Sequence, residues 1–217
     1  RAALAVKQRK NAKGNIKAMY RDDMNIEDVL NSPIICDPLH LYEAVYPVDG
    51  FHAFVVSRNG SSSSLREVQV IAYGEGHSNL LPCEMDDIVT TPAKESSFAA
   101  GFDPKGADCL QLYDSFTITV MLQIEDIGVV EKGRVGGFVE NTDISPQGDL
   151  PLNTGGGSLN VGQPAYMSGG VLLEEALDQL NDRASGHQVH GAEKVYINAI
   201  GGWNRGHSVT LVIGEKD

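Results

Sequence analysis

The alternation of helical and strand patterns in the second half of the chain most narrows the folds that it can adopt. Apolar residues recur at every third or fourth position over 115–127 and again over 168–180, which predicts two amphipathic helices. Runs rich in β-branched residues over 194–200 and 208–213 predict two strands. Because helices that alternate with strands pack on a sheet, we expect an α/β fold.

The first half carries shorter patterns. Residues 1–15 have helical spacing, and 25–30 predict a short helix. The proline-containing stretch 32–41 predicts an ordered loop. Two runs rich in β-branched residues predict buried strands, AFVVS at 53–57 and EVQVIAY at 67–73. The charged, proline-containing stretch 75–97 predicts an irregular surface segment.

Charge argues against nucleic acid as a partner. Phosphate binding needs a basic face, whereas this chain of 217 residues has a formal charge of −12. Its main basic cluster, residues 1–17, has no interleaved aromatic residues and is predicted to form a solvated helix.

Cysteine usage and hydropathy indicate a reducing compartment. Cys36, Cys83 and Cys109 lie far apart and form no CxxC pair, which argues against a zinc site or a disulfide framework. The chain has no apolar run of membrane-spanning length, and its first residues do not have the pattern of a signal peptide. We expect a cytoplasmic protein with no membrane span.

A glycine-rich loop, NTGGGSLNVGQPAYMSGG at 153–170, has the composition of a ligand-binding loop. Glycine lets backbone N–H groups approach a ligand closely. The loop contains neither the lysine of a P-loop nor the GxGxxG spacing of a dinucleotide fingerprint. Its ligand therefore has to be inferred from the residues around it.

Four stretches resemble thiolases, in the order in which thiolases carry them. They are DPLHLYEAVYPVDGFHAFVVS at 37–57, YDSF at 113–116, GQPAYMSGG at 162–170 and NAIGG at 198–202. The resemblance implies the thiolase fold, layered α/β/α/β/α, of which this chain covers mainly the C-terminal half. It implies that 1–60 end the N-terminal half, and that 61–217 form the C-terminal half with an irregular insertion around 75–97.

The departures from the thiolase pattern affect its chemistry. Gln163 stands where thiolases have a histidine that activates the nucleophilic cysteine, and Asn198 stands where they have a second cysteine. An amide donates a hydrogen bond to an oxyanion but does not deprotonate a thiol. With Tyr113 and Tyr166 in the motifs, the pattern resembles lipid-transfer-protein and sterol-carrier-type thiolases. It is most similar to the thiolase-like aldolases of steroid side chains, which split a β-hydroxyacyl-CoA by retro-aldol cleavage.

The resemblance implies a set of site residues. The predicted catalytic residues are Tyr113, Tyr166, Gln163 and His207, and the predicted substrate-binding residues are Gly156, Gly157, Ser168, Gly201 and Gly202. Three of the catalytic residues have a structural alternative: a buried tyrosine at 113, a subunit contact at 166, and a surface position at the start of a strand for 207. Asp114 is predicted to be the N-cap of the helix over 115–127.

No metal ligands or tightly bound cofactor are expected, and coenzyme A enters as part of the substrate. His187 and His190 have no carboxylate or cysteine near them in the sequence. The resemblance also implies a homodimer and a small OB-fold, zinc-ribbon partner protein. Because the chain opens with neither methionine nor an N-cap residue, we expect a fragment or subunit whose beginning lies elsewhere.

Two other functions stay open. One is an acetyl-CoA acyltransferase, a true thiolase, that uses a cysteine outside this chain. The other is a non-catalytic subunit that binds acyl-CoA or lipid. A cysteine at the nucleophile position of the missing half would favour the acyltransferase, and its replacement would favour the aldolase.

Overall fold

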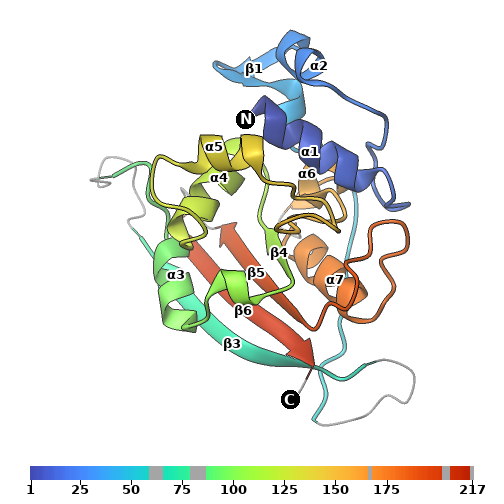
Figure 1. Ribbon diagram of the computed structural model, residues 1–217, viewed down its shortest axis with the longest axis vertical. Helices are drawn as coiled ribbons and strands as arrows, with labels where there is room; N and C mark the ends of the chain where they lie inside the picture. The colour runs from blue at the N-terminus through green and yellow to red at the C-terminus, as the bar shows by residue number, and fades with distance from the viewer. Residues whose placement is uncertain (59–65, 79–86, 166–167, 202–205, 216–217) are drawn as a thin grey trace.

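A mixed four-stranded sheet forms the centre of the computed structural model (Figure 1). The strand order is β3-β6-β5-β4, with β4 parallel to β5 and β6 antiparallel to both β5 and β3. Strands β3, β4 and β5 therefore all end at the same edge of the sheet. The strands are β3 (Val68–His77), β4 (Cys109–Leu112), β5 (Lys194–Gly201) and β6 (His207–Glu215). The structure describes residues 1–58, 66–78, 87–165, 168–201 and 206–215.

Helices cover both faces of this sheet (Figure 1). Successive side chains of a strand point to opposite faces, so each strand contributes to two apolar clusters. Leu110, Tyr196 and Val212 pack toward α3, α4 and α5, whereas Cys109, Val195 and Ile213 pack toward α7. These helices are α3 (Ala93–Ala100), α4 (Thr117–Asp126), α5 (Val135–Asn141) and α7 (Ser168–Leu180).

The N-terminal residues pack outside this layered body. Helix α1 (Ala2–Ala12) contacts the short helix α6 (Gly157–Val161), and Asn25 caps α2 (Ile26–Asn31). The prediction of a solvated helix over 1–17 is wrong for part of α1. Its Gln8, Arg9 and Asn11 side chains are buried because they hydrogen-bond to groups of the second half of the chain. The remaining short elements are β1 (Ile34–Cys36), β2 (Leu39–His40) and the 3-10 helices Leu41–Glu43 and Pro104–Gly106.

The patterns of the second half are confirmed as two helices and two strands. The strand predicted over 67–73 is also present and continues to His77, but the prediction that it is buried is wrong, because Val70, Ile71 and Tyr73 are 63%, 40% and 55% exposed. The segment 75–97 is therefore less irregular than predicted, because β3 enters it and α3 begins within it at Ala93. The stretch 32–41, predicted as a loop, contains the β1–β2 hairpin.

The predicted strand over 53–57 is wrong. These residues form no strand, and Val55 and Val56 are 96% and 95% exposed. A strand is stable only when another strand pairs with it, and no described residue pairs with this run.

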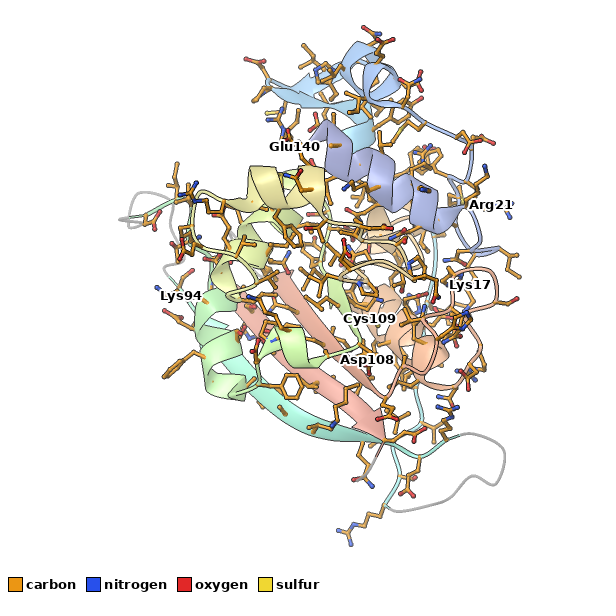
Figure 2. All side chains as sticks on the ribbon, viewed as in Figure 1. Lys17, Arg21, Lys94, Asp108, Cys109 and Glu140 are labelled. Carbon is orange, nitrogen blue, oxygen red and sulfur yellow. The ribbon has the colours of Figure 1, made fainter. Side chains whose placement is uncertain are left out.

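Two further sequence predictions concern Cys109 and membrane-spanning helices. Cys109 lies in the interior at the start of β4 (Figure 2), where burial raises the pKa of its thiol, so it behaves as a small apolar residue. In the described part of the chain, no helix is both long enough and apolar enough to cross a membrane.

Candidate active site

Strands β3, β4 and β5 end at one edge of the sheet, and several predicted site residues lie at this edge. Tyr113 follows β4 directly, Gly201 ends β5, and His207 begins β6. Gly201 and His207 are paired across the β5–β6 ladder, and Gly201 is exposed. We call this edge the strand-end site.

Tyr113 is held firmly at this edge by its backbone. Its N–H donates to the Asn198 carbonyl at 3.0 Å, and its own carbonyl accepts from the Gln123 side-chain amide at 2.6 Å. The half-buried side chain packs against both apolar clusters. The position of Tyr113 is therefore set by the sheet and by α4 together.

Hydrogen bonds from the segment 44–48 connect Gln163 to the motif YDSF, which carries Tyr113. The Gln163 N–H donates to the Tyr46 carbonyl at 2.9 Å, and its carbonyl accepts from the Val48 N–H at 3.1 Å. The Val45 N–H donates to the Ser115 carbonyl at 3.0 Å. The segment thus joins the loop that carries Gln163 to the motif that carries Tyr113.

The Gln163 side chain has one hydrogen-bond donor in use. Its Nε2 donates to the Ala165 carbonyl at 3.2 Å, and among the described residues no hydrogen bond uses its second amide hydrogen. Its Oε1 is buried with no hydrogen-bond partner among the described residues. Gln163 can therefore act as a neutral donor, and it has no proton that titrates near neutral pH.

Asn198 is part of a buried network of hydroxyl groups. Its Nδ2 lies 3.1 Å from Ser96 Oγ, 3.2 Å from Ser208 Oγ and 2.9 Å from Thr210 Oγ1. The residue is fully buried between β5, β6 and α3. Its amide therefore connects these elements and offers no acid or base.

Asp114 does not cap α4, so that prediction is wrong. The residue that precedes α4 is Phe116, and it makes no side-chain cap. The buried Asp114 carboxylate instead accepts hydrogen bonds from the backbone N–H groups of Ser158 at 2.8 Å and Leu159 at 3.1 Å, and from Gln8 Nε2 at 2.7 Å. Burial raises the pKa of Asp114 to about 6, against the opposing effect of these bonds. Asp114 thus fixes α6 and α1 to the end of β4.

Two of the predicted substrate-binding glycines, Gly156 and Gly157, are packed against protein atoms, whereas Gly201 has open space beside it. A Cβ at Gly157, where φ is +65°, would lie 2.0 Å from Asp114 Oδ2, and one at Gly156 would lie 2.4 Å from Ala12 Cβ. Their lack of a side chain is explained by this close packing, which gives no support to direct substrate contact. Ser168 is buried as the first residue of α7. Tyr166 and Gly202 lie outside the described residues.

His207 lies apart from Tyr113. The two residues are separated by two strand spacings, about 10 Å, and by two residues along the strands, about 7 Å. His207 Nε2 instead lies 2.7 Å from Glu75 Oε1, and its ring stacks on that of His77 with centroids 4.4 Å apart.

Sequence reasoning missed Glu75 and His77 as neighbours of His207. Alternate positions of one strand share a face, so the pair could have been found if the strand had been extended beyond residue 73. His187 was predicted to have no carboxylate near it, but in the structure its Nε2 lies 3.1 Å from Glu175 Oε2.

A cleft of about 710 Å³ lies between the loop that follows α1, residues 51–54 and α7. Lys17 (Figure 2) binds both Glu174 and Asp178 at 2.7 Å, and His52 Nδ1 lies 2.9 Å from Glu174. Arg183, also in the lining, pairs with Asp178 at 2.8 Å. Because carboxylates of the cleft already pair with Lys17 and Arg183, the cleft offers no surplus of positive charge for the phosphates of coenzyme A.

The chain is similar to known thiolases and thiolase-like lyases. The thiolase C-terminal domain-like family model matches residues 74–215. An acetyl-CoA acetyltransferase of Methanothermobacter thermautotrophicus is 30% identical over 208 residues, which are 93% of this chain and 54% of that protein. The 17-hydroxy-3-oxo-4-pregnene-20-carboxyl-CoA lyase of Mycobacterium tuberculosis is 31% identical over 209 residues, 91% of this chain and 53% of that protein.

A solved structure, the Ltp2-ChsH2(DUF35) aldolase, superposes with a TM-score of 0.80 at 23% identity. The superposition covers 99% of this chain and 57% of that one. It confirms the predicted thiolase fold and its C-terminal half. The chain spans about half the length of the curated relatives it matches. It belongs to the thiolase C-terminal domain-like family.

Proposed function

We propose that this chain is part of a thiolase-like enzyme that cleaves the Cα–Cβ bond of a β-hydroxyacyl-CoA by a retro-aldol reaction. One observation carries the proposal: neutral amides occupy both positions at which thiolases have their acid–base residues. Asn198 is bound within a buried hydroxyl network, and Gln163 uses only one of its two amide hydrogens in the part of the chain that the structure describes. The Gln163 amide suits charge stabilisation, and neither amide suits activation of a thiol.

The proposed reaction needs a base and an oxyanion donor, but no acyl-cysteine. A base removes the β-hydroxyl proton, that oxygen forms a carbonyl, and the Cα–Cβ bond breaks. Its electron pair becomes an enolate on the thioester, which is then protonated at Cα to give a shortened acyl-CoA. In this scheme Gln163 Nε2 donates to the thioester oxygen as its charge develops. Tyr113 or Tyr166 handles the protons, because His207 lies too far from Tyr113 to share its substrate atoms.

The relatives support both this reaction and an alternative. The Mycobacterium tuberculosis relative is named as a lyase of a hydroxylated carboxyl-CoA, which agrees with carbon–carbon cleavage. The Methanothermobacter relative is named as an acetyltransferase, and it is almost as similar to this chain. A transferase would need a cysteine from outside this chain and a base in place of Gln163.

A partner protein is part of the proposal. The solved aldolase is named as a combination of Ltp2 with ChsH2(DUF35). By analogy, this enzyme would act as a homodimer together with a small OB-fold, zinc-ribbon protein that helps to complete the site.

Replacement of Gln163 by alanine tests the proposed oxyanion donor. We expect kcat for carbon–carbon cleavage to fall by ~10²-fold or more with KM almost unchanged, because the donor acts mainly when charge reaches the thioester oxygen. Steady-state kinetics of the purified complex measure both constants.

Gln147→Ala is the matched control, because Gln147 also donates one hydrogen bond to a backbone carbonyl, that of Gln188, at an exposed position. It should retain wild-type kinetics. Gln163→His restores the thiolase residue, and without a nearby cysteine it should create no thiolytic activity. An unchanged kcat in Gln163→Ala would remove Gln163 from the mechanism.

A further inference from the structure

One half of the sheet face that carries α7 is left open in the described structure. Helix α7 packs on β4 and β5, whereas residues of β3 on the same face, such as Tyr73, are 55% exposed. Gly74 and Gly76 face α3 on the opposite side, since a Cβ at Gly74 would lie 2.1 Å from the Ser96 carbonyl oxygen. The alternate residues Glu75 and His77 therefore project from the open half.

His207 joins these two residues from the neighbouring strand. It is paired directly with His77 in the β3–β6 ladder, so both side chains project from the same face. His207 Nε2 lies 2.7 Å and His77 Nε2 lies 3.6 Å from the same Glu75 oxygen, Oε1. One ligand atom from each of the three residues lies within 4.8 Å of the other two.

We propose that Glu75, His77 and His207 bind one divalent first-row metal ion, with Zn²⁺ as the representative case. Two imidazole nitrogens and one carboxylate oxygen are a ligand set that zinc uses when water occupies its fourth position. Around such an ion the ligand atoms lie about 3.3 Å apart. The distances of the two imidazole nitrogens from the carboxylate oxygen, 2.7 and 3.6 Å, lie on either side of this spacing. The side chains of His77, His207 and Glu75 are 67%, 40% and 42% exposed and are free to adjust.

A neighbouring hydroxyl group orients the carboxylate. Tyr73 Oη donates to Glu75 Oε2 at 3.0 Å, which leaves Oε1 directed toward the two imidazoles. Hydrogen bonds of this kind fix the orientation of metal ligands and typically change metal affinity by about 10- to 100-fold. Tyr73 is therefore a positioning residue of the proposed site.

The competing explanation is a hydrogen-bonded cluster that shares only protons. A His–Glu hydrogen bond at 2.7 Å is also stable without a metal ion. The two explanations differ in what happens when Zn²⁺ is added, because only a metal site binds it with a fixed stoichiometry through all three residues. The proposal does not depend on the aldol reaction, so either can fail alone.

Titration calorimetry with ZnCl₂ on the tag-free, chelator-treated protein tests the proposal. We expect one Zn²⁺ ion per chain, with proton release that depends on pH, because imidazole must be deprotonated to bind. His77→Gln and Glu75→Gln should each weaken binding by more than tenfold, and Tyr73→Phe by about tenfold. These substitutions lie on an exposed face, and circular dichroism checks that each variant is folded.

The control is His190→Gln, because His190 is an exposed histidine on the loop between α7 and β5, whereas the proposed ligands lie on β3 and β6. It should bind Zn²⁺ like the wild type. No binding by the wild type, or full binding by both His77→Gln and Glu75→Gln, would overturn the proposal. Weakening in His190→Gln equal to that in His77→Gln would also overturn it, since it would indicate scattered surface histidines.

Discussion

Replacement of Tyr113 by phenylalanine is expected to lower turnover by ~10²-fold or more, with the fold and acyl-CoA affinity retained. The substitution removes one hydroxyl group and keeps the ring, which packs against both apolar clusters. The two backbone hydrogen bonds of Tyr113, to Asn198 and Gln123, do not depend on that hydroxyl. A loss of kcat would therefore report proton handling, which steady-state kinetics of the purified complex can measure.

Tyr42→Phe is the matched control, because it also removes a single phenolic hydroxyl. Its ring lies 5.7 Å from the Arg9 guanidinium and packs against the cluster of α1, α2 and α6, not against the two clusters that contact Tyr113. It should leave kcat and KM unchanged. If Tyr113→Phe turns over as fast as the wild type, Tyr113 has no part in the mechanism and is a partly buried structural tyrosine.

Replacement of Asp114 by alanine is expected to lower the free energy of unfolding by ~3 kcal/mol or more. The change leaves three donors, Ser158 N–H, Leu159 N–H and Gln8 Nε2, without their acceptor in a buried position. Each buried donor that loses its partner costs about 1–3 kcal/mol. Urea unfolding followed by circular dichroism gives the difference.

Asp108→Ala is the control, because Asp108 also accepts two backbone N–H groups, those of Glu193 and Lys194, but at an exposed position. Water can replace that acceptor, so a loss below about 1 kcal/mol is expected. A loss for Asp114→Ala no larger than that for Asp108→Ala would show that Asp114 does not anchor α6 and α1.

The pH dependence of the free energy of unfolding gives a second test of the role of Asp114. Its pKa is raised by burial to about 6, above the unfolded value of 3.8, so the folded state binds this proton more tightly. The resulting stability is fully present below 3.8 and is lost as pH rises through 6. The stability difference between wild type and Asp114→Ala should therefore grow by about 2 kcal/mol between pH 7 and pH 4.

The second half of the fold was predictable because its patterns are long and regular. The apolar positions of α4 and α7 recur at helical spacing, and β5 and β6 are rich in β-branched residues. Each pattern agrees with the burial that the structure shows, because one face of each helix packs against the sheet. Local sequence and tertiary packing favour the same structure there.

The misses have physical causes outside the local sequence. Residues 53–57 have strand composition, but pairing depends on a partner strand that a local pattern does not reveal. Helix α3 has few large apolar residues because it packs closely on the glycines of β3. Its helical character therefore depends on tertiary contact more than on an amphipathic pattern.

Site residues were predicted from motifs, and motifs do not describe packing. The loop of Gln163 and the motif of Tyr113 do meet, through residues 44–48. Asp114 was assigned to the helix that follows it in sequence, whereas it binds a helix more than forty residues away. The cluster of His77 with His207 joins two strands whose pairing no motif indicates.

Product analysis of the purified complex with a β-hydroxyacyl-CoA that is branched or cyclic at the β-carbon tests the central claim most directly. The account predicts release of a ketone or aldehyde together with a shortened acyl-CoA, in equal amounts and without added free coenzyme A. Cleavage of a β-ketoacyl-CoA that depends on free coenzyme A, with no cleavage of the β-hydroxy substrate, would contradict it and identify a true thiolase.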